Sequence, residues 1–359
     1  MINVGVDLHK TQFTVYETSG EWKQYRTSER GYAEFFERVR DWQEGGEEVR
    51  IGVESTGNTR YFKNQLETVG CEVRVINTLK FKVVNESVKK TDKHDAATIA
   101  EFLSKDMLPE SQICTEESEQ IRRLLKSRQT LVRAGVTIKN QIHALLTGIG
   151  MEDKKASLQS KKGRQRILDA LKETGNVLVV QPLIDTISSL EENVKVIEKE
   201  IEKLTVGDKV VELLKTIPGC GNIGAWTIRA HTDDIKRFAS AKKYAAYAGL
   251  VPWVQNSNER IHHGKITKRG PEELRTALVQ LVLGMRRSKK KTVGWRIMNR
   301  YEMMRKTKGT GKSIIASARK VSCIIWTMLT NEKEFDCALM LDKKLSQTAD
   351  SMRNLAYSL

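Results

Sequence analysis

Cysteine is scarce in this chain, and its few copies are not arranged in pairs. The five cysteines are odd in number, and no two of them form a CxxC motif. This pattern predicts reduced thiols in a cytoplasmic protein, and it argues against a disulfide framework or a cysteine-bound zinc ion. The residues are Cys71, Cys114, Cys220, Cys323 and Cys337.

Long apolar runs are also missing. No stretch approaches the ~20 apolar residues of a membrane-spanning helix, and the first residues lack the basic and then apolar pattern of a secretion signal. We therefore expect a cytoplasmic protein with no membrane partner. The 359 residues are 39% hydrophobic, which is enough to bury cores in two or three domains.

What the chain has in excess is positive charge. Its 61 Lys+Arg and 45 Asp+Glu give a formal net charge of +16. Residues 251–320 hold 18 basic and 4 acidic residues, interrupted by Trp253, Trp295 and Tyr301. A short basic run is usually a solvated helix face, but a surplus this large favours a polyanion. We predict nucleic acid as the partner, and therefore a location at the bacterial nucleoid.

Residues 1–105 alternate between strand and helix patterns. The order β-β-β-α-β-α-β-α predicts a mixed sheet covered by helices, as in ribonuclease-H-like folds. Strands are expected at Ile2–Asp7, Gln12–Glu17, Glu21–Arg26, Val49–Glu54 and Glu72–Asn77. Helices are expected at Gly31–Trp42 and Thr59–Val69, and an Ala-rich helical pattern follows Asp95.

The second half of the chain has mainly helical periodicity, so the fold class is α/β plus α. Helices are expected at Glu117–Gly148 and Pro182–Thr205, with a polar linker at Met151–Lys162 between them. The apolar spacing of the second helix is typical of a coiled-coil seam. We therefore expect domains at 1–108, 109–209 (a helical arm) and 210–335 (mostly helical), with a tail at 336–359.

Four acidic residues stand where a metal-dependent nuclease needs ligands. Asp7 and Glu54 end two apolar strand patterns, and Asp92 and Asp95 open the Ala-rich helical pattern at spacing i, i+3. Carboxylates gathered at strand ends repel one another unless a cation lies between them. Hard oxygen ligands suit Mg²⁺, with Mn²⁺ as the other choice. Each acid alone is an ordinary surface residue, but the combined pattern favours a metal site that acts on a phosphate.

Two glycine-bearing segments lie in the basic half. Pro218–Gly224 is either a phosphate cradle at a helix N-terminus or a tight turn that needs glycine at positive φ. Lys308–Ser313 ends like a Walker A loop, but Lys306 replaces its first glycine and no strand pattern precedes it, so ATP binding is rejected. The basic residues expected to contact nucleic acid are Lys265, Lys268, Arg269, Arg286, Arg287 and Lys312.

Ser257 is the only serine between Ala241 and Arg287, and we expect it in a polar loop. A serine in an Asn-rich loop is normally a turn residue. The alternative is a nucleophile, because the surrounding cations could stabilise the charge of a pentacovalent phosphate. His262 and His263 could carry protons or simply lie on the surface. Composition alone leaves both interpretations open.

Several segments, taken in order, resemble the DEDD-type insertion-sequence transposases. These are serine-bearing recombinases guided by a bridge RNA. A RuvC-like front half followed by an Ala-Gly-Leu-x-Pro segment is shared with few other proteins. The segments are Gly5-Val6-Asp7, Val53-Glu54-Ser55-Thr56-Gly57, Val75-Ile76-Asn77, Lys90-Thr91-Asp92-Lys93-His94-Asp95-Ala96, Ile217-Pro218-Gly219 and Tyr244-Ala245-Ala246-Tyr247-Ala248-Gly249-Leu250-Val251-Pro252.

The resemblance implies that Asp7, Glu54, Asp92 and Asp95 bind Mg²⁺ in a RuvC-like domain, and that Ser257 is the nucleophile of a transposase domain. It also implies donor and target DNA, a non-coding guide RNA, and a homo-oligomer (a dimer or a tetramer) with composite sites. The hypothesis is strand exchange through a phosphoserine link. The alternatives are a hydrolytic nuclease like a Holliday-junction resolvase, and a non-enzymatic nucleic-acid scaffold.

Overall fold

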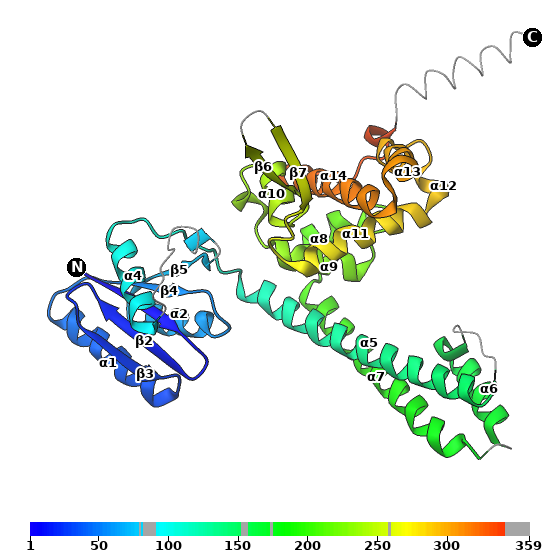
Figure 1. The fold of residues 1–359 in the computed structure, drawn as a ribbon, viewed down its shortest axis with the longest axis horizontal. Helices are drawn as coiled ribbons and strands as arrows, with labels where there is room; N and C mark the ends of the chain where they lie inside the picture. Colours follow the sequence, from blue (N-terminus) through cyan, green and yellow to red (C-terminus); the bar gives the residue numbers. More distant parts are fainter. Residues whose placement is uncertain (79, 82–90, 152–156, 173–174, 258–259, 342–359) are drawn as a thin grey trace, which may run out of the picture. The chain divides into compact units, whose positions relative to one another are not determined.

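The computed structural model describes residues 1–78, 80–81, 91–151, 157–172, 175–257 and 260–341. The chain forms two compact units, Met1–Cys114 and Thr115–Leu359 (Figure 1). Each unit has its own hydrophobic core. In the described parts of the chain, no helix combines the length with the apolar character that crossing a bilayer requires.

The first unit contains the predicted mixed sheet. Its strand order is β3-β2-β1-β4-β5, in which β1 pairs antiparallel with β2 and parallel with β4. The sequence-based strand limits are confirmed to within one residue, because the apolar runs of the central strands are buried on both faces. The strands are β1 (Ile2–Leu8), β2 (Gln12–Glu17), β3 (Trp22–Arg26), β4 (Val49–Glu54) and β5 (Glu72–Ile76).

Helices cover both faces of this sheet. On one face, Val6 of β1 shares a core cluster with Phe35 of α1 (Glu29–Glu44) and Phe62 of α2 (Thr59–Thr68). On the other face, where Gly5 points, lies α4 (Asp92–Ser104). Successive residues of a strand face opposite sides, so the face that carries Gly5 also carries Asp7.

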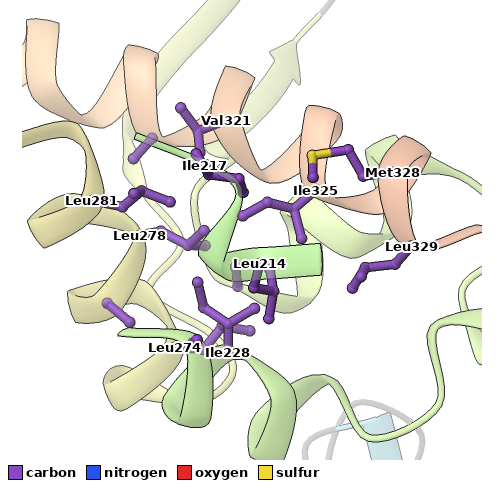
Figure 2. Packing of buried hydrophobic residues seen from close by; sticks show 14 of the residues in the cluster. Leu214, Ile217, Ile228, Leu274, Leu278, Leu281, Val321, Ile325, Met328 and Leu329 are labelled. Carbon is purple, nitrogen blue, oxygen red and sulfur yellow. The ribbon is translucent and has the colours of Figure 1, made fainter. Parts of the chain in front are cut away.

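The second unit is mostly helical, as predicted. Its main core joins helices that are distant in sequence: Leu214 of α8, Ile228 of α9 and Leu278 of α11 meet Val321 and Ile325 of α14 (Figure 2). The helices are α5 (Glu116–Gly148), α6 (Lys161–Leu171), α7 (Val177–Leu204), α8 (Lys209–Lys215), α9 (Asn222–Thr232), α10 (Ala241–Tyr247), α11 (Glu272–Arg287), α12 (Lys289–Thr292), α13 (Arg296–Lys308) and α14 (Thr310–Thr330), with 3₁₀ turns η1 (Ser157–Gln159), η3 (Ile235–Arg237) and η4 (Ala338–Met340).

The two long helices α5 and α7 pack along each other (Figure 1). The apolar residues predicted for the α7 seam are buried near its ends, at Ile187 and Ile201, and half-buried at Leu190 and Val194 between them. Helix α7 begins at Val177, ahead of the predicted start at Pro182, which lies inside the helix.

The interpretation of residues 151–162 as a polar linker is wrong for its described part. This segment contains η1 and the start of α6, and Leu158 is fully buried in the cluster where α5, α6 and α7 meet. Ser160 caps α6 by accepting a hydrogen bond from the Gly163 N–H. Gly163 is required because a Cβ there would lie 1.9 Å from the Ser157 carbonyl oxygen. Residues 152–156 lie outside the described part of the chain.

Candidate functional site

Two of the four predicted acids end neighbouring parallel strands. The last paired residues of β1 and β4 are Val6 and Val53, and Asp7 and Glu54 come directly after them. Because this register is in phase, both acidic side chains leave the same face of the sheet, on strands about 4.8 Å apart. Asp7 is buried and Glu54 is half-buried. The main-chain carbonyl of Glu54 accepts a 2.7 Å hydrogen bond from the Thr59 hydroxyl, which holds the end of β4.

The other two acids lie in the first turn of α4. Thr91 caps this helix by accepting a hydrogen bond from the His94 N–H, and Asp92 and Asp95 follow at the positive end of its dipole. Helix α4 can approach β1 only because Gly5 has no side chain. A Cβ at Gly5 would lie 2.0 Å from the Ala96 carbonyl oxygen.

A second glycine extends the contact between α4 and the sheet. Gly52 of β4 is the register partner of Gly5, and a Cβ at Gly52 would lie 2.9 Å from Ile99 Cγ2 of α4. The two glycines therefore leave a shallow depression across two strands, a seat against which α4 packs. This seat brings the first turn of α4 to the carboxyl end of β1 and β4.

The structure brings Asp7 and Asp92 together with His9, a residue that the sequence-based reasoning missed. His9 Nε2 lies 3.0 Å from Asp7 Oδ2 and 3.8 Å from Asp92 Oδ1. One ligand atom from each of the three residues lies within 4.8 Å of the other two. The Gln12 amide also donates to Asp92 Oδ2 at 3.1 Å. The signal available in the sequence was the position of His9, two residues after Asp7.

Of the two remaining acids, Asp95 interacts electrostatically with this group. Burial raises the pKa of Asp7, and the nearby charges of Asp92 and Asp95 raise it further, whereas His9 lowers it. Asp95 is therefore close enough to Asp7 to act on its charge, although Asp95 and Glu54 are not members of the three-residue group. Negative charge that is concentrated and partly desolvated in this way is stabilised by a divalent cation. The donor set, carboxylates with one imidazole, fits such an ion.

Ser257 lies in a β-hairpin, and the expectation of a polar loop is wrong. Strand β6 (Pro252–Ser257) pairs antiparallel with β7 (Arg260–Ile266), and the last pair of the hairpin is Ser257 with Arg260. The side chain of Ser257 lies outside the described part of the structure. Trp253, on the same strand, is half exposed and packs against Gly264.

Two glycines at the base of this hairpin occupy positions where a side chain would collide with the main chain. Gly249 has φ of 68°, and a Cβ there would lie 2.6 Å from the Arg269 carbonyl oxygen. Gly270 has φ of 100°, and a Cβ there would lie 1.8 Å from the Tyr247 carbonyl oxygen. The Arg275 guanidinium donates to the Lys268 carbonyl at 3.2 Å. The segment that precedes β6 is thus clamped to the segment that follows β7.

The predicted nucleic-acid contacts differ in exposure. Arg286 is half-buried: its guanidinium lies over the Tyr301 ring, and its Nε lies 4.0 Å from Glu302 Oε1 of α13. The other five are exposed, namely Lys265, Lys268, Arg269, Arg287 and Lys312. Lys312 follows the junction of α13 and α14, so the Walker-like segment connects two helices.

The glycine turn before α9 has the backbone of a tight turn. Gly219 has φ of 92°, and a Cβ there would lie 2.7 Å from the main chain of Gly284 in α11. The turn therefore uses glycine both for its conformation and for close packing on α11. Next to it, burial raises the pKa of the Cys220 thiol to about 12, so this thiol stays protonated.

Two family models match the chain. Residues 4–151, which contain the acidic cluster, match a DEDD transposase model of the IS110 type that is described as Transposase. Residues 211–294, which contain the β6–β7 hairpin, match the Transposase IS116/IS110/IS902 family.

Relatives of known description agree with these matches. A protein of Pseudomonas aeruginosa named "Probable family 20 transposase" is 28% identical over 67% of this chain and 72% of its own length. The "Transposase for insertion sequence element IS1111A" of Coxiella burnetii is 25% identical over 80% of this chain and 79% of its own length. The "Pilin gene-inverting protein" of Moraxella lacunata is 24% identical over 93% of this chain and 97% of its own length. Together with the two models, these likenesses show that the chain belongs to the IS110 family of transposases.

Proposed function

We propose that this transposase exchanges DNA strands through a covalent phosphoserine link at Ser257, with Mg²⁺ or Mn²⁺ held by Asp7, Glu54, Asp92 and Asp95. The observation that carries the proposal is the convergence of Asp7 and Asp92, from β1 and α4, at the carboxyl edge of the sheet. Residues 1–108 would act as a RuvC-like domain, 109–209 as a coiled-coil arm and 210–335 as the serine-bearing domain, followed by the tail 336–359.

The chemistry balances without an external energy source. The Oγ of Ser257 attacks the scissile phosphorus, a P–O bond to one DNA segment breaks, and the serine proton ends on the leaving hydroxyl. A hydroxyl of the new partner strand then attacks the phosphoserine and releases Ser257. The divalent ion, when bound, would stabilise the charge that develops on the phosphate. One ester replaces another at each step, so no ATP is needed.

Rejoining, rather than hydrolysis, is favoured by the relatives that invert DNA. The Moraxella protein spans nearly this whole chain and is named for inverting a pilin gene. Inversion requires that cut ends be joined again, which a hydrolytic nuclease does not do. A resolvase-like hydrolase, in which water attacks and Ser257 is structural, is the alternative function.

The partners of the reaction would be donor DNA, target DNA and a non-coding guide RNA, recognised by a dimer or tetramer at the bacterial nucleoid. Base pairing between RNA and DNA would select the target, while the protein contacts the backbone. Phosphates would be neutralised by the exposed cations Lys265, Lys268, Arg269, Arg287 and Lys312, together with the half-buried Arg286. The large basic surplus of residues 251–320 supports this role.

The test is a denaturing gel of the protein incubated with labelled donor DNA and Mg²⁺. We expect a protein–DNA adduct from the wild type and from Asn256→Ala, a neighbouring change on the same strand, but none from Ser257→Ala. Cutting of DNA by Ser257→Ala at the wild-type rate would instead establish the hydrolytic alternative.

A further inference from the structure

His9 is the one residue of the three-membered group that supplies nitrogen instead of oxygen. Its Nε2 lies 3.0 Å from Asp7 Oδ2 and 3.8 Å from Asp92 Oδ1. Around an octahedral ion with ligands at about 2.1 Å, neighbouring ligand atoms are about 3 Å apart and opposite ones about 4 Å apart. The 3.0 Å distance therefore equals the spacing of neighbouring ligands, and the 3.8 Å distance lies between the two spacings.

The main chain of His9 is held from two other elements. Its carbonyl accepts hydrogen bonds from the Thr27 hydroxyl at 3.0 Å and from the Asn58 amide at 3.4 Å. Its N–H donates to the Gln12 carbonyl at 2.9 Å across the β1–β2 turn. The His9 side chain is 51% exposed, so an ion and a substrate can both reach it from solvent. The imidazole is thus presented at the cluster by a fixed turn.

A nitrogen ligand changes which ions the site selects. Mg²⁺ takes oxygen ligands and keeps much of its water, whereas divalent transition-metal ions accept imidazole nitrogen readily. A centre built only from Asp7, Glu54, Asp92 and Asp95 would have no such bias.

We propose that His9 Nε2 is a direct ligand of the divalent ion, and that this nitrogen makes the centre prefer Mn²⁺ to Mg²⁺. The inference rests on the metal centre of the proposed function and adds to it a ligand outside the four acids. His9 also lies between Asp7 and Asp92, within ion-pair distance of both carboxylates.

The experiment is pulsed electron paramagnetic resonance of the full-length chain loaded with Mn²⁺, in the absence of DNA. We expect nitrogen modulation from a coordinated imidazole in the wild type and its loss in His9→Ala. A second variant, His9→Gln, keeps a side-chain hydrogen-bond donor but offers no imidazole, so it should lose the modulation as well. His94→Ala is the matched control, because it removes another exposed histidine of the same unit and should retain the signal.

Titrations on the same samples measure selectivity. His9→Ala should bind Mn²⁺ about tenfold or more weakly, with a smaller loss for Mg²⁺, which replaces the missing ligand with water. Thermal melts confirm that each variant is folded. Persistent nitrogen modulation in His9→Ala, or equal losses for both ions, would overturn the ligand role alone. Absence of Mn²⁺ binding in the wild type would overturn both this inference and the proposed metal centre, whereas the fate of the Ser257 adduct is decided separately.

Discussion

The position of Asp7 is unfavourable for a charged carboxylate when no cation is bound. Its carboxylate is buried at the end of β1, with Asp92 and Asp95 of α4 acting on it, and these influences raise its pKa. A raised pKa means that the charged form is less stable in the fold than in the unfolded chain. Such strain at a cluster of acids is typical of residues retained for function.

The Asp7→Asn variant should therefore be more stable than the wild type in EDTA, because the amide carries no charge to desolvate. With saturating Mg²⁺ the order should reverse, because only the wild type gains stability from binding the ion. Urea unfolding with and without Mg²⁺ measures both effects. DNA strand exchange by Asp7→Asn should fall by about 10³-fold or more. Equal stability in EDTA would mean that the carboxylate is not strained.

A second residue-scale prediction concerns His231 in the helical unit. Burial, reinforced by Arg122, lowers the pKa of His231 from 6.5 to about 4. The unfolded chain then binds more protons than the folded one between these values, so stability falls as the pH drops from 6.5 to 4. The loss approaches ~3 kcal/mol as an upper limit. Thermal melts between pH 7 and pH 4 should show it, and His231→Gln should flatten the slope.

At this scale the sequence identifies only part of the site. Asp7 and Asp92 could be predicted to meet because each stands at the end of an element with a clear pattern. His9 could not, because its position depends on the turn between β1 and β2 and on the distant donors Thr27 and Asn58. A turn residue carries no periodicity that would point it at a neighbour.

At the scale of elements, the seat that Gly5 and Gly52 provide for α4 decides whether the acids converge. A Cβ at Gly5 would lie 2.0 Å from the Ala96 carbonyl and 2.5 Å from the Ala100 N, which are backbone atoms of a helix. Backbone atoms cannot turn aside as a flexible side chain can. The whole helix would have to move away from β1, and Asp92 and Asp95 would move with it.

Gly5→Ala should therefore destabilise the first unit by about 2–4 kcal/mol and weaken metal binding in whatever fraction remains folded. Gly57→Ala is the matched control, because among the described residues no atom beyond its chain neighbours lies within 4 Å of a Cβ there, and its φ is not positive. That variant should be neutral or slightly stabilising. Urea unfolding together with Mn²⁺ titration provides the measurement, and a Gly5→Ala protein with unchanged affinity would show that α4 does not position the ligands.

The elements that sequence patterns predicted well are those with two buried faces or long apolar stripes. Strands β1 and β4 are mostly apolar and buried, and β5 alternates charged with apolar residues, so their limits are clear. The β6–β7 hairpin and α6 were missed for the opposite reason. Residues 252–266 mix Trp253 with many polar and basic residues, and α6 begins inside a Lys- and Ser-rich stretch. Their conformation depends on close backbone contacts that carry no periodicity, between Gly270 and Tyr247 for the hairpin and between Gly163 and Ser157 for α6.

At the scale of the whole molecule, the two halves of the proposed chemistry lie in different units. The acidic cluster belongs to Met1–Cys114, and the hairpin that carries Ser257 belongs to Thr115–Leu359. The mixed α/β front and helical back could be predicted from sequence, because each pattern is local. The sequence could not predict which acidic cluster acts with which serine in an oligomer, because that pairing depends on assembly and not on any periodicity of one chain.

We expect the cluster of one subunit to act on the serine of another, and two inactive variants should then complement each other. In an equimolar mixture of Asp7→Asn and Ser257→Ala chains that assort at random into dimers, half the dimers are mixed, and each contains one intact composite site. Activity should therefore recover to about one quarter of the wild type. Mixing Asp7→Asn with Asp92→Asn is the control, because no pairing of those chains restores the cluster. If mixed dimers form, as differential tags can verify, yet no strand exchange returns, each active site must be built within a single chain.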